Sequence, residues 1–458
     1  MQNNNDTAAA SSAAGAGKAG FMAWYATVML AFLYWLSILD RFIISLVVDP
    51  IKRDLGISDV QFGFLHGGAF AVAFALFGLI AGVLADRFNR RWVIFAGVTI
   101  WSLATAACGL ANNFWHMLLA RVGVGSGEAV LNPCATSMIT DLFPRERLTS
   151  AMAVYAIGAT LGSGCAYLIG GVIVSMVAQS ATYVLPVIGE VRSWQAVFFL
   201  VGIPGSLLAL LLFTVREPAR RGVMADLAQQ PFTFASAFGA YGALLRFMGP
   251  RRRFFFCHYA GFGLASMIIS GAGTWYPAHM GRNFGWGASQ IGLSLGLMLV
   301  TAGVVGKLIC GNAVDYLYRR GYRDAQIRWY GICLLLALPF GLVATTSANP
   351  WVFLIGLGTF IALTAPLPAC ASAALNLATP NELRGSGVAL FAATGGLIGA
   401  ATGPVLIAMA SDCLFGGGAS IGLGIATMMA ICCPLGAIAL FCGLGAMRDA
   451  VAEAEALE

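Results

Sequence analysis

Two pairs of charged residues lie within stretches of sequence that are otherwise apolar. Arg121 and Glu128 occupy a run from about residue 115 to residue 142, which is long enough to cross a lipid bilayer as a helix. Asp40 and Arg41 lie deep in the first apolar segment. Ionised side chains are costly in hydrocarbon unless they face a partner or a water-filled cavity, where they can bind an anion or exchange a proton. The four residues therefore predict the working centre of a membrane transporter.

The spacing within each pair limits the geometry. Arg121 and Glu128 are seven residues apart, so a helix places them on nearly the same face, about 10 Å from each other. Glycines at every second position between them leave the backbone open to close packing or to a ligand. Asp40 and Arg41 are adjacent and point about 100° apart, so one can face a cavity while the other pairs sideways. The alternative for each pair is a static ion pair that only holds helices together.

The composition places these residues in a polytopic membrane protein. Of the 458 residues, 59% are hydrophobic and only 10% are charged, whereas soluble domains carry about 25% charged residues. The net charge of +6 does not indicate nucleic-acid binding, because no basic face with interleaved aromatic residues is visible. The 11 cysteines are scattered, without the spacing of metal ligands, and we interpret them as small buried apolar residues. No nucleotide-binding motif and no nucleophile–base pair stand out, so ATP-driven pumping and enzymatic activity are disfavoured and no cofactor is expected.

Twelve apolar segments predict an all-α protein with twelve membrane helices. The longest polar connection, residues 217–252, divides them into six and six. We therefore predict a disordered cytoplasmic tail over residues 1–20, an N-terminal bundle over 21–216, a cytoplasmic linker over 217–252, a C-terminal bundle over 253–447 and a second cytoplasmic tail over 448–458. The segments lie at about residues 22–48, 60–85, 92–111, 115–142, 148–177, 194–215, 254–279, 289–316, 327–346, 351–377, 383–411 and 421–446.

The distribution of basic residues predicts the orientation. With the N-terminus in the cytoplasm, 19 of the 26 lysines and arginines fall on the cytoplasmic side, four on the other side and three within the membrane. Both termini should therefore be cytoplasmic. No cleavable signal precedes the first segment, and the short loops suit a bacterial inner membrane.

A charged motif follows the second segment and has a copy in the second half of the chain. Asp86 ends one predicted helix and arginines open the next, so a carboxylate and several guanidiniums could lock neighbouring helices at the cytoplasmic face. The copy lies 229 residues further on, which indicates two parallel repeats with a site between them. An ordinary positively charged loop would need neither an aspartate at fixed spacing nor a copy. The predicted gate residues are Gly82, Asp86, Arg87, Arg90, Arg91, Asp315, Arg319 and Arg320.

The stretch from Gly82 to Arg91 resembles the loop signature of the major facilitator superfamily, with Asn89 where that pattern usually has glycine. Asparagine tolerates a left-handed turn better than other residues with side chains. Together with Asp40-Arg41 and the stretch from Arg121 to Glu128, the motif is similar to the Spinster family of lipid transporters, through about residue 171. The resemblance implies a major facilitator fold of two pseudosymmetric six-helix bundles that work by alternating access. It also implies lysolipid or sphingoid-type substrates.

The resemblance further implies that Asp40 and Glu128 correspond to acids that couple transport to protons. Burial in a dry cavity favours a neutral carboxyl group and a nearby arginine favours an ionised one, so binding of an anion to the arginine would change proton affinity. We expect Asp40 and Glu128 to carry protons and Arg41 and Arg121 to hold an anionic headgroup. The alternatives are transport of a small organic anion, sugar phosphate or drug, a passive lipid conduit, and a sensor.

Two further residues are assigned to the substrate site. Lys307, in the eighth segment, could complete the anion site or could instead extend towards the membrane interface. Asn132 precedes Pro133, and the kink expected there would free backbone carbonyl groups for a cavity. We expect the protein to act as a monomer, with membrane lipids and a small-molecule or lipid substrate as its partners.

Overall fold

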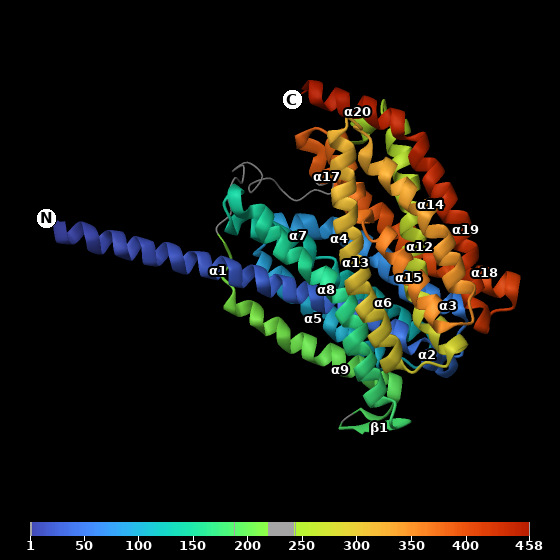
Figure 1. Cartoon of the computed structure of the whole chain (residues 1–458). Coiled ribbons are helices and arrows are strands. Elements are labelled where there is room, and N and C mark those ends of the chain that lie inside the picture. The colour runs from blue at the N-terminus through green and yellow to red at the C-terminus, as the bar shows by residue number, and fades with distance from the viewer. Residues whose placement is uncertain (1, 187, 219–241, 243, 458) are drawn as a thin grey trace.

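The computed structural model describes the chain except for residues 1, 187, 219–241, 243 and 458. The two halves of the chain form two helical bundles that lie side by side, the first in blue to green and the second in yellow to red (Figure 1). The first bundle contains α1 Gln2–Ile43, η1 Ile44–Val47, α2 Val48–Leu55, α3 Asp59–Gly63, η2 Phe64–Ala69, α4 Phe70–Arg87, α5 Arg90–Cys108, α6 Phe114–Glu128, α7 Leu131–Leu142, α8 Arg145–Val177, β1 Thr182–Leu185, β2 Gly189–Arg192, α9 Ser193–Leu208 and η3 Ala209–Thr214. The second contains α12 Arg252–Phe284, α13 Ala288–Arg319, α14 Ala325–Thr346, α15 Pro350–Thr364, α16 Leu367–Ala378, α17 Asn381–Gly396, η4 Leu397–Thr402, α18 Gly403–Phe415, η5 Gly418–Ser420, α19 Ile421–Cys442 and α20 Leu444–Leu457.

The described helices account for the predicted membrane crossings. Eleven helical stretches are long and apolar enough to span a bilayer. The predicted segment 115–142 differs, because a turn at Ala129 and Val130 divides it into the shorter helices α6 and α7. Pro133 lies in the first turn of α7, where a missing backbone N–H costs no helical hydrogen bond. The expected kink therefore coincides with the break that ends α6 at Glu128.

Glycines let the two bundles approach each other along two seams. In the first seam α8 packs along α13, where a Cβ atom on Gly164 would lie only 2.8 Å from the carbonyl oxygen of Gly296. In the second seam the π-helical turns η2 and η4 face each other, and a Cβ atom on Gly67 would collide with the carbonyl oxygen of Ala400. Both seams therefore need glycine at the point of closest approach.

The chain ends and connections differ from the simplest expectation. Residues 1–20, expected to be disordered, continue α1 as helix back to Gln2, and the alanines that are frequent there favour helix. Residues 448–458, expected to be a tail, mostly belong to α20, which packs on the second bundle through the buried Val451. Within the predicted linker 217–252, residues 219–241 and 243 lie outside the described part, and α12 begins at Arg252. The antiparallel hairpin of β1 and β2 was not predicted.

Candidate functional site

The centre of the first bundle holds an ion pair between Arg41 and Glu128. Arg41 lies at the end of α1 and Glu128 at the end of α6, and Arg41 Nη2 donates to Glu128 Oε2 over 2.5 Å. The Glu128 side chain is fully buried, whereas the Arg41 side chain is 29% exposed. The other oxygen of Glu128 has no hydrogen-bond partner among the described residues. The pair therefore connects a buried carboxylate to the accessible surface of the bundle through one guanidinium.

Arg121 lies in the same cluster but does not form the ion pair that its spacing from Glu128 suggested. Its guanidinium is buried and donates long hydrogen bonds of 3.5 Å and 3.4 Å to the carbonyl oxygens of Leu65 and His66. Both carbonyls belong to η2, and π-helical turns of this kind occur often at functional sites. The break after Glu128 and the crossing of α1 decide the pairing, so Glu128 meets Arg41 instead of the residue two turns earlier on its own helix.

The ring of Phe70 joins the two arginines. The Arg41 guanidinium carbon lies 4.6 Å from the ring centroid and that of Arg121 lies 5.4 Å from it, both within the range of cation–π attraction. Phe74 lies 5.4 Å from Arg41 in the same way. The sequence analysis did not assign either ring to the site. Phe70 and Phe74 lie four residues apart, about one helical turn, in the predicted segment 60–85, and this spacing was a usable signal.

Asp40 is buried in the same bundle without a hydrogen bond to a described residue. The residue is 1% exposed, and neither carboxylate oxygen has a hydrogen-bond partner there. Trp101 and Thr105 of α5 each bring a hydrogen-bond donor close to Asp40, without the geometry of a regular hydrogen bond. A buried ionised carboxylate without regular hydrogen bonds is costly even near a cation such as Arg121, so a bound proton or a rearrangement that supplies a donor would stabilise this position.

The predicted gate residues are held by partners that the motif did not reveal. Arg90, buried, donates to Asp141 over 2.5 Å, to Glu217 over 2.8 Å and to Ser137 over 2.8 Å. The main-chain N–H of Arg91 donates to the second carboxylate oxygen of Glu217 over 3.0 Å. These bonds tie α5 to α7 and to the chain after η3, all within the first bundle.

The rest of the predicted gate is less connected. The side chains of Asp86 and Arg87 lie outside the described part of the structure. A Cβ atom on Gly82 would meet no atom within 4 Å. In the second bundle Asp315, Arg319 and Arg320 are exposed, and no ion pair joins them to another described residue. Among the described side chains, no ion pair joins the second copy of the motif to the first.

Asn132 and Lys307 do not lie together. The side-chain oxygen of Asn132 accepts a 2.5 Å hydrogen bond from the hydroxyl of Tyr155, within the first bundle. Lys307 instead lines a cavity of about 200 Å³ between the bundles, whose other lining residues are mainly apolar and include Phe42, Tyr167 and Tyr276. The structure therefore places Lys307 at an apolar cavity between the bundles and Asn132 within the first bundle.

A second charged cluster, which the sequence reasoning did not assign to the site, joins the bundles at the end opposite Arg90. Arg282 of α12 donates to Asp59 over 2.9 Å and to Asp49 over 2.6 Å, and its guanidinium also reaches the carbonyl oxygen of Gly418 at 3.0 Å. Lys52 forms a 2.5 Å ion pair with the nearly buried Asp59. We call these residues the Arg282 cluster. The sequence contained a signal for this cluster. Asp49 and Asp59 of the first half and Arg282 of the second half fall in predicted connections on the same side of the membrane and carry opposite charges.

Comparisons with known proteins agree with this architecture. The family model described as Major Facilitator Superfamily matches residues 30–404, so the chain belongs to that superfamily of membrane transporters. The predicted fold class and the expectation of a transporter instead of an enzyme are thereby confirmed.

Individual relatives show which members of the superfamily the chain resembles. The chain is 28% identical over 393 residues to an MFS-type efflux pump of Mycolicibacterium smegmatis, covering 86% of this chain and 85% of the pump. It is 24% identical over 334 residues to Protein spinster of Drosophila melanogaster, covering 71% of this chain and 51% of that protein. The crystal structure of a bacterial homologue of the human lysosomal transporter Spinster, inward-facing and unoccupied, matches with a TM-score of 0.75 at 24% identity, over 94% of this chain and 98% of that one. The predicted resemblance to the Spinster family is confirmed.

Proposed function

We propose that this transporter moves an amphipathic, lipid-like anion or zwitterion of the lysolipid or sphingoid type, coupled to protons, by alternating access. The observation that carries the proposal is the Arg41–Glu128 pair, in which only the guanidinium is partly exposed. An anionic headgroup that reaches Arg41 from the accessible side would compete with Glu128 for the same donor. Because Glu128 is buried, losing this partner would favour uptake of a proton.

Asp40 and Arg121 complete the proposed coupling. Arg121 shares the Phe70 ring with Arg41, so it can hold the headgroup when Arg41 moves. Asp40, which has no hydrogen-bond partner among the described residues, is the second proton site. Lys307 and the apolar cavity that it lines would accept the acyl chain, with the ammonium group near the polar end of the substrate.

The Arg282 cluster supports alternating access. It closes one end between the bundles, while the Asp315 and Arg319 copy of the gate motif at the other end is exposed and unpaired with described residues. We infer that the described state is inward-facing, as is the bacterial Spinster homologue, with both termini in the cytoplasm of a bacterial cell. The Arg282 cluster would then open when the cytoplasmic gate closes.

Uptake into proteoliposomes with an imposed pH gradient tests the proposal directly. Fluorescent lysolipids and sphingoid lipids should accumulate only when the gradient is present, and Glu128→Gln should remove the effect of the gradient. Flux that ignores the gradient would identify a passive conduit, and binding without uptake would identify a sensor. Intact pH dependence in Glu128→Gln would exclude the proton role of that residue.

A small organic anion or drug is the second candidate substrate. The similarity to a protein described as an efflux pump favours it. Thermal-shift measurements that compare lipids with organic acids and drugs can distinguish the lipid substrate from the small-molecule substrate. Stabilisation only by the small molecules would overturn the lipid substrate but leave alternating access in place.

A further inference from the structure

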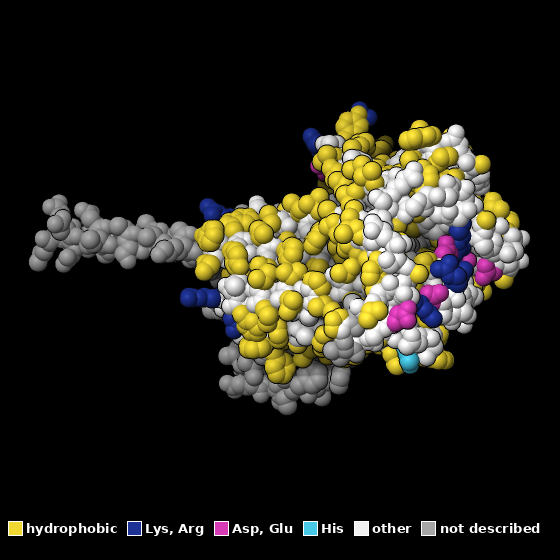
Figure 2. All heavy atoms as spheres, turned by 90° about the horizontal axis from the view of Figure 1, so that it is seen from below, with side chains coloured by type: hydrophobic (Ala, Val, Ile, Leu, Met, Phe, Trp, Pro, Cys, Tyr) yellow, Lys and Arg dark blue, Asp and Glu magenta, His cyan; other side chains and the backbone are white. Residues whose placement is uncertain are grey.

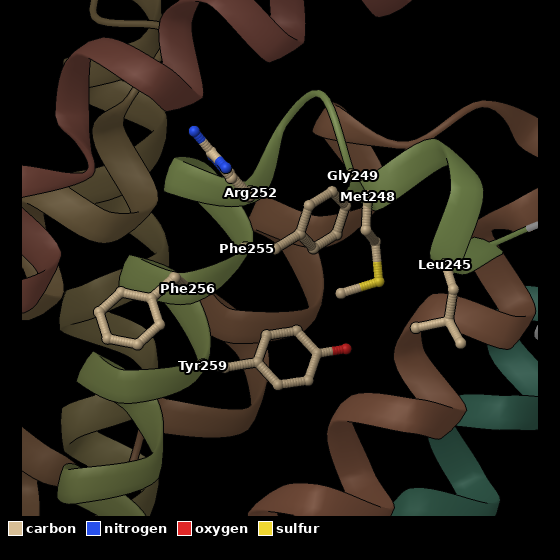
Figure 3. Close-up of a pocket in the computed structure, with 7 residues that line it drawn as sticks. All are labelled: Leu245, Met248, Gly249, Arg252, Phe255, Phe256 and Tyr259. Carbon is tan, nitrogen blue, oxygen red and sulfur yellow. The ribbon is translucent and has the colours of Figure 1, made fainter.

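A pocket that plays no part in the proposed transport route lies where the linker meets α12. Its volume is about 280 Å³, and it is bounded by the segment that ends the linker and by the first two turns of α12. In Figure 3, Phe255 and Tyr259 extend from α12 towards Met248 and Leu245 of the linker, whereas Phe256 and the guanidinium of Arg252 extend from the other side of α12, at the edge of the pocket. The pocket therefore combines an apolar floor with a cationic rim.

The sequence around the pocket is basic, although Arg252 is the arginine that lines the pocket itself. Arg246, Arg251, Arg252 and Arg253 fall within eight residues of the sequence. Arg251 forms a 2.6 Å ion pair with Glu453 and lies over the ring of Phe247, so its charge is already balanced. Arg252 and Arg253 are exposed, and neither forms an ion pair with a described residue.

The apolar part of the pocket faces outwards. Phe256 is 74% exposed and Leu245 is 59% exposed, which is costly in water but not against acyl chains. Arg252 opens the membrane helix, and Tyr259 lies seven residues, or about 10 Å, further along it. This distance matches the step from the phosphate level of a bilayer to the upper part of its hydrocarbon.

We propose that this pocket binds an anionic phospholipid of the surrounding bilayer. The phosphate would lie against the guanidinium of Arg252 at the edge of the pocket, and one acyl chain would pass along α12 over the exposed ring of Phe256. Basic pockets beside membrane helices recognise anionic headgroups in this way. A zwitterionic lipid fits less well, because its ammonium group would face the arginines.

A lipid in this position would connect the linker to the second bundle. Leu245 and Met248 come from the linker, whereas Tyr259 on α12 donates a 3.5 Å hydrogen bond to the carbonyl oxygen of Gly387 on α17. The α17 helix in turn contacts α4 of the first bundle. The bound lipid would therefore hold Leu245 and Met248 against the start of α12.

The test measures binding of phosphatidylglycerol and of phosphatidylcholine with the same acyl chains to the full-length protein in detergent, by native mass spectrometry. We expect phosphatidylglycerol to bind more tightly to the unaltered protein, and Arg252→Gln to reduce that preference about fivefold, the effect expected of one basic residue near an anionic headgroup. The double variant Arg252→Gln/Arg253→Gln should reduce it further. The control Arg147→Gln removes an exposed arginine from the first bundle and should leave the preference unchanged.

Two further measurements keep the outcome decisive. Phe256→Ala changes only an exposed ring, so it should fold normally and should weaken binding of both lipids. Inorganic phosphate in millimolar excess should not displace phosphatidylglycerol. Equal binding of the two lipids, equal effects of Arg252→Gln and Arg147→Gln, or displacement by phosphate would each overturn the proposal.

Discussion

Replacing Arg282 by glutamine should shift the protein towards the conformation in which the Arg282 end is open. Arg282 is the cation that joins α12 to both Asp49 and Asp59 across the bundle interface. Glutamine keeps some hydrogen-bonding capacity but removes the charge and the forked geometry that bonds two carboxylates at once. Lys52 remains beside the buried Asp59 at 2.5 Å, and Asp49 is half exposed to solvent, so the variant leaves no buried carboxylate without a cation and should fold.

The size of the shift follows from the exposure of the two carboxylates. The Asp59 side chain is 3% exposed, and its hydrogen bonds to a charged donor contribute about 1.5–3 kcal/mol. The Asp49 side chain is 50% exposed, so solvent screening reduces that contribution to about 0.2–1 kcal/mol. Together these contacts stabilise the closed conformation of this end by about 2–4 kcal/mol, and they are lost when it opens. Since 1.4 kcal/mol is a factor of ten, the open population should rise about 30-fold or more.

Distance measurements between two spin labels can detect this change. Labels at the exposed positions Val184 in β1 and Ala419 in η5 report on the two bundles at the Arg282 end, after the exposed Cys413 and Cys442 are replaced by serine. We expect Arg282→Gln to add a population with a longer distance.

The matched control is Arg192→Gln. Arg192 lies at the same end, but its 3.7 Å ion pair with Asp54 stays within the first bundle, so its loss should not change the distance. An unchanged distance distribution in Arg282→Gln, or the same change in both variants, would refute the reasoning that the cluster holds this end closed.

Three further outcomes are expected. Glu128→Gln should abolish the response of uptake to an imposed pH gradient while substrate still binds, as measured in proteoliposomes and by thermal shift; retained gradient dependence would contradict it. Arg90→Gln should lower stability by about 3 kcal/mol, because it removes the buried guanidinium that Asp141 and Glu217 share, and thermal unfolding in detergent should show this against Arg147→Gln. Gly67→Ala should impair transport or assembly, because its Cβ atom would collide with the carbonyl oxygen of Ala400. The control Gly311→Ala should be tolerated, because a Cβ atom there meets no atom within 4 Å. Equal activity of the two variants would show that the η2–η4 seam is not tightly packed.

The amino-acid sequence by itself determined the membrane class, the twelve crossings and the division into two halves, because these depend on composition and on the length of apolar runs. It also identified Asp40, Arg41, Arg121 and Glu128, since a charge in hydrocarbon is conspicuous wherever it occurs. The proline at position 133 also predicted a kink in segment 115–142, whereas the break at Ala129 and Val130 that divides this segment into two helices was not predicted.

Only the tertiary structure decided which of these groups are partners. Glu128 pairs with Arg41, 87 residues away, and not with Arg121 on its own helix. Arg90 pairs with Glu217, 127 residues away, and Arg282 pairs with Asp49, 233 residues away. Spacing along one helix is set by helical geometry and can be calculated from the sequence, whereas the pairing of charges on different helices depends on how those helices cross and rotate, which the packing of the whole bundle decides.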